Sequence, residues 1–520
     1  MIASSFSSGL LSSLVPMPVH QALARDLLVL PVLLPLAAAC LSLLTSSIRW
    51  RRTLMLGTTL LLVALSGWLL PMADLGQVLV YRLGNWPVPV AIVLCLDRLS
   101  ALLLLLTAIV ATGSAWAAVR GDDQHGPHFH AALLLLIAGV NGAFLTGDVF
   151  NLFVSFELLL IASYGLLVFG GTPARVRSGV QYVVLNLVGS SIFLVGIGML
   201  YSVTGTLNLA ELSQRVALLD APSAAFARSG ALLLLVVFAL KAALVPFSFW
   251  LPAAYSAASP PVAALFAILT KVGVYAILRM STMVVGTDAA LRANLYGEWL
   301  WPMAVATVAF GALAAIGTRS VRRLQSALLI VSVGTMLASM AHGSEAGLSA
   351  GLFYLVHSTI AAAAMFLIAG LSEQRDAPRR WTSVLFFVGA LSVAGLPPLS
   401  GFLGKVLMLQ AFPADSRLPV MWAVVLGSSL LAVIALSRRG AALFWGAADV
   451  PETSTLPRPP DQRLVPRALL SRVPPTALLL VLAAVTIGAG ALSDFTQRTA
   501  QQLLAPGQLR SQIPDAPGGR

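Results

Sequence analysis

Long apolar segments alternate with short polar stretches along almost the whole chain of 520 residues. A helix needs about 20 mostly apolar residues to cross a bilayer. About fourteen segments meet this requirement. They begin near Leu27, Thr53, Ala91, Phe129, Val149, Val180, Gly230, Ser259, Trp301, Leu324, Gly347, Trp381, Leu418 and Pro475. A spanning chain must satisfy its own backbone polar groups, so the segments are predicted to be helical. The pattern predicts an all-α polytopic membrane protein with about 14 transmembrane helices.

The distribution of polar stretches predicts one membrane domain rather than several. We expect an N-terminal extension at 1–26, a membrane core at 27–445, a polar Pro- and Arg-rich cytoplasmic loop at 446–474, a last transmembrane helix at 475–494 and a fraying polar tail at 495–520.

Two segments are interrupted by prolines. The seventh reads FALKAALVPFSFWLPAAY and the twelfth reads VAGLPPLSGFLGKVLML. Proline removes a backbone donor and breaks or kinks a helix. The predicted breaks fall at Pro246, Pro252, Pro397 and Pro398. Paired broken helices in matching places indicate inverted repeats around a central site. We therefore predict two inverted five-helix repeats, at roughly 129–283 and 301–445.

Charged residues make up 10% of the chain and hydrophobic residues 58%, which excludes a soluble globular domain. The net charge of +12 could suggest nucleic-acid binding. However, when the loop Arg49–Arg52 is placed in the cytoplasm, the cytoplasmic loops carry 18 arginines and the opposite side 10. This asymmetry follows the positive-inside rule. The charge therefore indicates membrane topology with both termini outside. It predicts membrane lipid, and no nucleic acid, as a partner.

Only three of the 32 Lys and Arg residues are lysines, and all three lie inside apolar segments: Lys241, Lys271 and Lys405. A charged side chain inside a bilayer is costly and marks a functional position by default. Lysine, unlike arginine, can lose its proton when it is desolvated. The distribution suggests a membrane protein that moves protons.

Two further ionisable residues lie near the middle of apolar segments. Glu157 is the one acidic residue deep in any such segment, and His357 lies in the eleventh. Taken alone, each could be a structural ion pair or a satisfied core histidine. Together with the lysines they favour a proton pathway, in which Glu157 holds Lys241 charged and Lys271, His357 and Lys405 are successive stops. Water and hydroxyl groups would bridge the gaps.

No metal or cofactor site is predicted. Cys40 and Cys95 form no CxxC pattern, and no NAD, flavin, haem or iron–sulfur motif is present. His125, His128 and His130 cluster in a cytoplasmic loop, where we interpret them as solvated. The chain is therefore expected to be a transport subunit rather than an enzyme.

Three long stretches carry a family resemblance. They are GDVFNLFVSFELLLIASYGL, QYVVLNLVGSSIFLVGIGMLYSVTGTLNLAEL and FALKAALVPFSFWLPAAYSAASPPVAALFAILTKVGVYAILR. They resemble the D-type subunit of the Mrp-type multisubunit cation/proton antiporters. More widely, they are similar to the antiporter-like subunits of respiratory complex I and membrane-bound hydrogenases. The resemblance covers roughly 27–445 and is strongest over 140–280.

The resemblance implies a fourteen-helix fold with two inverted five-helix repeats and broken helices seven and twelve. Glu157 matches the family's buried glutamate and Lys241 its partner lysine. Lys271 matches the central lysine of helix eight, His357 the helix-eleven histidine and Lys405 the helix-twelve lysine. The implied partners are a large A-type subunit and several small hydrophobic subunits of the antiporter.

The chain departs from the family pattern at two positions. Many relatives have a lysine four residues after the helix-eleven histidine, where this chain has Ala361. Many have an aspartate where this chain has Ala253. The first departure leaves a gap between His357 and Lys405 that water would have to bridge.

Three functions therefore remain open. The first is a secondary active transport subunit of the bacterial inner (plasma) membrane that exchanges protons for Na⁺, K⁺ or Li⁺. The second is a proton-pumping subunit of a complex I or membrane-bound hydrogenase type of redox enzyme. The third is a structural scaffold whose buried charges only fix helix packing.

Overall fold

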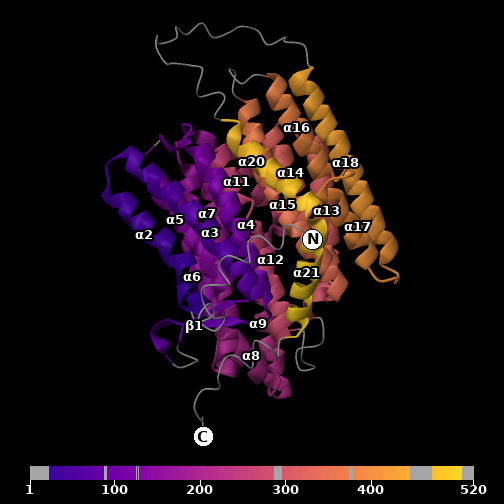
Figure 1. Ribbon diagram of the computed structural model, residues 1–520. Coiled ribbons are helices and arrows are strands. Elements are labelled where there is room, and N and C mark those ends of the chain that lie inside the picture. The colour runs from indigo at the N-terminus through magenta and orange to yellow at the C-terminus, as the bar shows by residue number, and fades with distance from the viewer. Residues whose placement is uncertain are drawn as a thin grey trace.

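The computed structural model describes residues 23–86, 91–124, 126, 128–285, 295–373, 379–445 and 471–505. Within these residues, eleven helices are long and apolar enough to cross a membrane, and a bent pair adds a twelfth. Phe129–Leu145 and Arg380–Ala394 are shorter apolar helices. Each of the fourteen predicted segments thus contains a helix, and the all-α polytopic class is confirmed (Figure 1). Most of the predicted extension at 1–26 and loop at 446–474 lie outside the described residues.

The N-terminal half of the structure is formed by the helices of the first eight predicted segments. Its main helices are α2 (Leu30–Leu44), α3 (Ile48–Asp74), α4 (Arg98–Ala118), α5 (Phe129–Leu145), α6 (Val149–Val168), α7 (Pro173–Thr204), α8 (Leu209–Val216), α9 (Ala221–Ala242), α10 (Trp250–Ala257), α11 (Pro260–Phe266) and α12 (Leu269–Met280).

The C-terminal half contains the other segments. Its helices are α13 (Leu295–Gly317), α14 (Val321–Met340), α15 (Glu345–Ser372), α16 (Arg379–Ala394), α17 (Ser400–Ala411), α18 (Leu418–Phe444), α20 (Val473–Ile487) and α21 (Ala489–Leu504).

A small sheet replaces the start of the third predicted segment. β1 (Leu79–Arg82) pairs antiparallel with β2 (Val93–Leu96), with Val80 opposite Cys95. α4 consequently begins at Arg98 rather than near Ala91, and the Asp97 side chain caps it by accepting from the Ser100 N–H at 2.9 Å.

Two other helices begin earlier than their hydrophobic pattern predicts. α7 begins at Pro173 instead of near Val180, and α9 at Ala221 instead of near Gly230. The Thr172 side chain caps α7, and a proline occupies the first turn of each helix. Capping side chains and N-terminal prolines extend helices into polar sequence that hydropathy alone does not detect.

The interior of the bundle is formed by the helices that are apolar on every side. The apolar windows of Pro260–Val285 and Glu345–Ser372 are 100% buried, and that of Val321–Met340 is 94% buried. By contrast, the window of Ile48–Asp74 is only 28% buried. α12, α14 and α15 therefore lie at the centre, while α2, α3 and α18 form the rim (Figure 1). A helix that is hydrophobic all round belongs in such an interior.

The two broken helices end in the same way. Ala243 follows α9 with a left-handed φ of 60°, and Gly395 follows α16 with a φ of 74°. In each case the next backbone N–H donates to the carbonyl five residues earlier, at 2.9 and 3.1 Å. This is the Schellman helix end, after which proline is common. Pro246 follows the first end, and Pro397 and Pro398 follow the second. The division into repeats at 129–283 and 301–445 stays a prediction.

Pro252 does not break a helix. It is the third residue of α10, which runs from Trp250 to Ala257. The backbone N–H groups of the first helical turn have no intrahelical partner, so a proline there removes no helical hydrogen bond.

The C-terminal end differs from the expected single helix and fraying tail. α20 ends at Ile487, and α21 turns from it by 78° and continues to Leu504. Phe495, Thr499 and Leu503 are buried at four-residue spacing, and α21 packs against α15. The polar residues on the other face of this amphipathic helix make the segment look like a solvated tail in the sequence.

The prediction that His130 is solvated is wrong. Its side chain is fully buried in α5, and its Nε2 lies 3.1 Å from Oδ2 of the buried Asp123. Arg52 donates to the same carboxylate from Nε at 2.6 Å. Burial alone would raise the pKa of Asp123, but the hydrogen bonds from His130 and Arg52 hold this pKa below its usual range. His128 is exposed as predicted, and His125 lies outside the described residues.

We predict that Asp123→Asn destabilises the protein by about 1–3 kcal/mol, because the amide removes charge-assisted hydrogen bonds of the buried carboxylate with His130 and the partly exposed Arg52. Since the Asp123 pKa is lowered by folding, its stabilisation should be present above about pH 4 and be lost on further acidification. The measurement is the thermal unfolding temperature in detergent. Asp415→Asn, in an exposed loop, is the control. Equal unfolding temperatures for the two variants would contradict the prediction.

Candidate functional site

Lys241 lies in the last turn of α9, directly before the first helix break, and is 5% exposed. Its Nζ donates to Asn186 Oδ1 on α7 at 3.0 Å. The same Nζ lies 5.9 Å from the centroid of the Phe156 ring, within the range of a cation–π interaction. A helix C-terminus also favours a cation. The ammonium is therefore held by an amide, a ring face and a helix end.

Glu157 is half-buried on α6 and accepts a hydrogen bond from Ser190 Oγ on α7. Asn186 and Ser190 are four residues apart and lie on one face of α7. In the described structure, therefore, α7 connects Glu157 to Lys241, and the two form no direct ion pair. The sequence led us to expect Lys241 as the partner of Glu157 and did not reveal this connection through α7. The signal for it is the four-residue spacing of the polar residues Tyr182, Asn186 and Ser190 within an apolar segment.

Lys271 is completely buried on α12. Its Nζ lies 3.4 Å from Thr270 Oγ1, at the long end of the hydrogen-bond range. α12 lies against α9 because Gly273 allows a very close approach: a Cβ there would lie 2.5 Å from the backbone nitrogen of Ala242. The contact places the helix that carries Lys271 directly beside the residue that follows Lys241.

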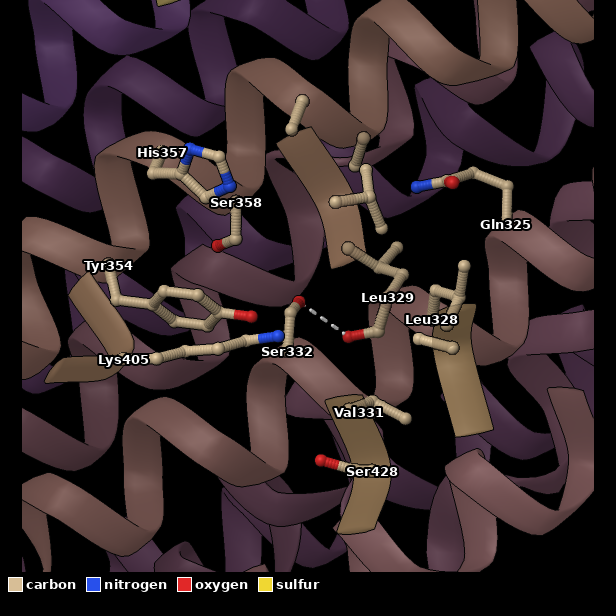
Figure 2. A pocket seen from close by; sticks show the side chains of 14 residues that line it. Gln325, Leu328, Leu329, Val331, Ser332, Tyr354, His357, Ser358, Lys405 and Ser428 are labelled. Atoms are coloured by element: carbon tan, nitrogen blue, oxygen red, sulfur yellow. Dashed lines mark hydrogen bonds between the residues drawn. The ribbon is translucent and has the colours of Figure 1, made fainter. Parts of the chain in front are cut away.

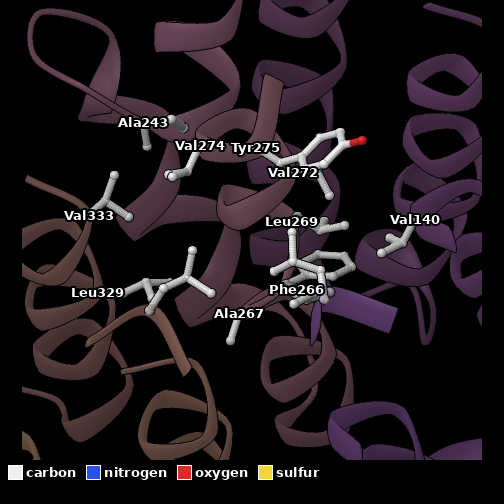
Figure 3. Close-up of a cluster of buried hydrophobic side chains, with 14 of the residues drawn as sticks. Val140, Ala243, Phe266, Ala267, Leu269, Val272, Val274, Tyr275, Leu329 and Val333 are labelled. Atoms are coloured by element: carbon white, nitrogen blue, oxygen red, sulfur yellow. The ribbon is translucent and has the colours of Figure 1, made fainter. Parts of the chain in front are cut away.

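Apolar side chains surround this part of α12. Figure 3 shows Phe266, Leu269 and Val272 packed toward Val140 of α5, with Val333 and Leu329 of α14 on the other side. All are buried. Lys271 is thus completely buried on a helix whose neighbours in this cluster are apolar, and a buried ammonium is costly.

Gly273→Ala is predicted to destabilise the fold by about 1–3 kcal/mol, because the added methyl group overpacks the contact between α9 and α12. Gly198→Ala is a matched control in α7, since a Cβ there meets no atom within 4 Å. Thermal unfolding of both variants in detergent tests this. A Gly273→Ala protein that unfolds at the temperature of the control would show that the contact is not tight.

His357 lies on α15 and is 1% exposed. Its Nδ1 lies 2.9 Å from Oγ of Ser400, the first residue of α17. The backbone N–H of Ser400 in turn donates to Thr486 Oγ1 on α20 at 3.0 Å. α17 therefore begins beside the imidazole, directly after the second helix break. Residues of α15, α17 and α20 together fix the position of the His357 ring.

Lys405 lies on α17 and closes the second break. Its Nζ donates to the carbonyl oxygen of Ala394, the last residue of α16, at 2.7 Å. It also donates to Ser429 Oγ on α18 at 2.8 Å. The partial negative charge at the end of α16 favours the ammonium. Lys405 thus acts as a cap for the broken helix.

A small cavity lies between His357 and Lys405 (Figure 2). Its water-accessible volume is about 20 Å³. This is enough for about one water molecule. Ala361 and Gln325 are among its lining residues, and the buried Oε1 of Gln325 has no hydrogen-bond partner among the described residues. The gap that Ala361 leaves in the sequence therefore corresponds to a water-sized cavity with both polar and apolar lining residues.

These features define a class of protein: a multi-pass membrane transporter subunit with two broken helices and buried ionisable side chains. Residues 146–432 match the family model described as NADH:quinone oxidoreductase/Mrp antiporter, transmembrane. The match covers more than half of the chain, and the chain belongs to this family.

Individual relatives agree with this assignment over nearly their whole length. The chain is 38% identical to the D-type subunit of a probable K⁺/H⁺ antiporter of Rhizobium meliloti, covering 94% of this chain and 98% of that protein. It is 33% identical to the D-type subunit of the Na⁺/H⁺ antiporter of Bacillus subtilis, covering 93% and 98%. Its fold matches a chain of the Mrp complex from a Dietzia species with a TM-score of 0.83, 29% identity and coverage of 96% and 100%.

Proposed function

We propose that the chain is the D-type subunit of a multisubunit monovalent cation/proton antiporter in the bacterial plasma membrane. In this secondary active transporter it conducts protons, in exchange for Na⁺ or another monovalent cation such as K⁺ or Li⁺. A large A-type subunit and small hydrophobic subunits complete the complex. The observation that carries the proposal is that each of the three buried lysines contacts only neutral groups within hydrogen-bond distance in the described structure.

This contrast separates the lysines from the structural charges of the protein. Arg279 is paired with Asp97 at 2.6 Å, and Arg98 with Asp74 at 3.0 Å. These arginines stay charged and hold helices together. The lysines of the pathway have no carboxylate within ion-pair distance among the described residues, and this supports proton exchange over a scaffold role.

The first half of the pathway operates through α7. Glu157 is close enough to favour the ammonium form of Lys241, and Ser190 and Asn186 hold the two side chains on one helix face. When Glu157 takes up a proton, this negative charge disappears, and the desolvated Lys241 ammonium can release its proton. Lys271, on the helix in contact with α9, is the proposed next acceptor.

The second half of the pathway operates through the cavity. Because His357 Nδ1 is bonded to Ser400 Oγ, the imidazole or this hydroxyl would have to turn before water in the cavity passes a proton between His357 and Lys405. Gln325 lies on the opposite side of the cavity in Figure 2, and its lone oxygen would hold water there, since a buried acceptor requires a donor. Lys405 returns to the ammonium form at the end of α16, where the carbonyl of Ala394 accepts from it.

The relatives favour an antiporter over a redox-driven pump. Those at 38% and 33% identity are named as D-type antiporter subunits and are covered over 98% of their length. A redox pump would give transport that follows electron flow in the assembled complex, and an antiporter gives transport that follows the cation gradient.

Glu157→Ala and Lys241→Ala are each predicted to lower cation-dependent proton movement in everted vesicles by about 100-fold or more, with assembly of the complex intact. The Lys271→Arg variant should lose cation-dependent proton movement to a similar extent, because arginine cannot release its proton. Glu211→Ala, which removes an acidic residue paired with Arg215 outside the pathway, is the control. Normal transport by the Glu157 and Lys241 variants would support the scaffold function. Activity of Lys271→Arg would exclude a proton step at that site.

Gln325→Leu is predicted to lower the transport rate several-fold, because water in the cavity that His357, Lys405 and Gln325 line loses a hydrogen-bond partner. An Ala361→Lys change would place an amine in the cavity and should make transport insensitive to Gln325→Leu. The measurement is the proton flux of the two single variants and the double variant. Gln410→Leu, which is exposed, is the control. Equal losses from Gln325→Leu in both backgrounds would rule out a water at this position.

A further inference from the structure

α16 and α18 enclose an apolar groove of about 200 Å³ that is separate from the proton pathway. Phe386 and Phe444 form its floor, with ring centroids 5.6 Å apart. Phe387 and Trp445 also line it and are 62% and 80% exposed. Because these side chains are exposed, the groove opens at the surface of the molecule, where α16 and α18 lie at the rim (Figure 1).

The length of the groove fits one leaflet of a bilayer. On α16 its lining runs from Ser383 to Ala394, and Leu396 follows in the break. Eleven residues of helix rise about 16 Å, which is about half of the 30 Å hydrocarbon core. The groove therefore reaches from one membrane surface to about the middle of the bilayer, as an acyl chain does.

The mouth of the groove is positively charged. Arg380 lies one turn before Ser383, at the mouth, while Arg438 follows Ser437 about halfway along the α18 lining, which runs from Val433 to Trp445. Both arginines are exposed, and neither α16 nor α18 contains an acidic residue. Trp381 and Trp445 are exposed at this end, as is typical of residues at a membrane surface. The arginine distribution places this end at the cytoplasmic leaflet.

We propose that this groove binds one acyl chain of an anionic phospholipid from the cytoplasmic leaflet, that Arg380 binds its phosphate, and that the long side chain of Arg438 extends from within the leaflet toward the same headgroup. An extended acyl chain fits between the aromatic walls, whereas a transmembrane helix of another protein is about 10 Å wide. A cationic site at the cytoplasmic end of membrane helices matches an anionic headgroup in charge.

The deep end of the groove reaches the second helix break. Ala394 and Leu396 line it, and the Ala394 carbonyl accepts from Lys405 Nζ at 2.7 Å. Val393, one residue earlier, lines the cavity on the other side. A bound chain therefore supports the helix end that Lys405 caps. This consequence, unlike lipid binding itself, rests on the proposed function.

The test uses the assembled complex in phosphatidylcholine vesicles, with brominated phosphatidylglycerol or brominated phosphatidylcholine as probe. Bromine quenches tryptophan fluorescence at short range, and the signal of Trp445 is the difference between the unchanged complex and Trp445→Phe. Half-maximal quenching by brominated phosphatidylglycerol is expected at a mole fraction at least about tenfold lower than that required with brominated phosphatidylcholine. Each arginine near the surface strengthens anionic-lipid attraction by about fivefold.

Two variants separate the headgroup from the chain. Arg380→Gln with Arg438→Gln should abolish the preference for the anionic lipid, while Arg417→Gln, at the other end of α18, should preserve it. Ala390→Phe, which fills the groove, should reduce quenching by both lipids. Equal quenching by the two lipids in the unchanged complex would overturn the anionic site. The absence of quenching by either lipid would overturn the proposal as a whole and show that another subunit covers the groove. Both readings are independent of transport activity.

Discussion

The buried ammonium group is the constraint on which the rest of the structure depends. Lys241, Lys271 and Lys405 are all at least 91% buried, and each contacts only neutral groups within hydrogen-bond distance in the described structure. A direct carboxylate partner would hold each proton permanently. Neutral amide, hydroxyl and carbonyl oxygens stabilise the ammonium less, and the proposed proton exchange rests on this difference. The arginines perform the opposite role, because Arg52, Arg98 and Arg279 are paired directly with aspartates.

The second helix break supplies one of these neutral oxygens, the Ala394 carbonyl. At a Schellman end the last carbonyls of a helix lose their usual partners and become acceptors for side chains. The indole of Trp250, just after the first break, donates to the Leu240 carbonyl at 3.1 Å. Lys405, just after the second break, donates to the Ala394 carbonyl in the same manner. The donor at the first break is thus the Trp250 indole, which does not titrate, whereas the donor at the second break is the Lys405 amine, which does. The second break can therefore respond to protonation, whereas the first serves mainly to end α9 beside α7.

The sequence predicts the apolar segments, the breaks at Pro246 and at Pro397 and Pro398, and the buried ionisable residues, because hydropathy and proline act locally. It does not predict contacts between distant segments. Asn186 and Ser190 are ordinary polar residues until α6 and α9 are packed against α7. His130 is a polar residue, yet it is buried, because its ring contacts the Asp123 carboxylate and Arg52 balances the charge of that carboxylate. α21 is hidden for a related reason: its apolar positions recur only on one face of an otherwise polar helix.

The two halves of the pathway differ in how a proton can cross them. Between Glu157 and Lys241 the connecting groups are side chains fixed on α7, so transfer there depends on rotation of hydroxyl and amine groups. Between His357 and Lys405 the connection passes through a cavity the size of a water molecule, because position 361 carries a methyl group. Lys271 is completely buried, and its Nζ contacts only Thr270 Oγ1 within hydrogen-bond distance among the described residues. A proton at Lys271 therefore needs a movement of α12 or transient hydration to proceed.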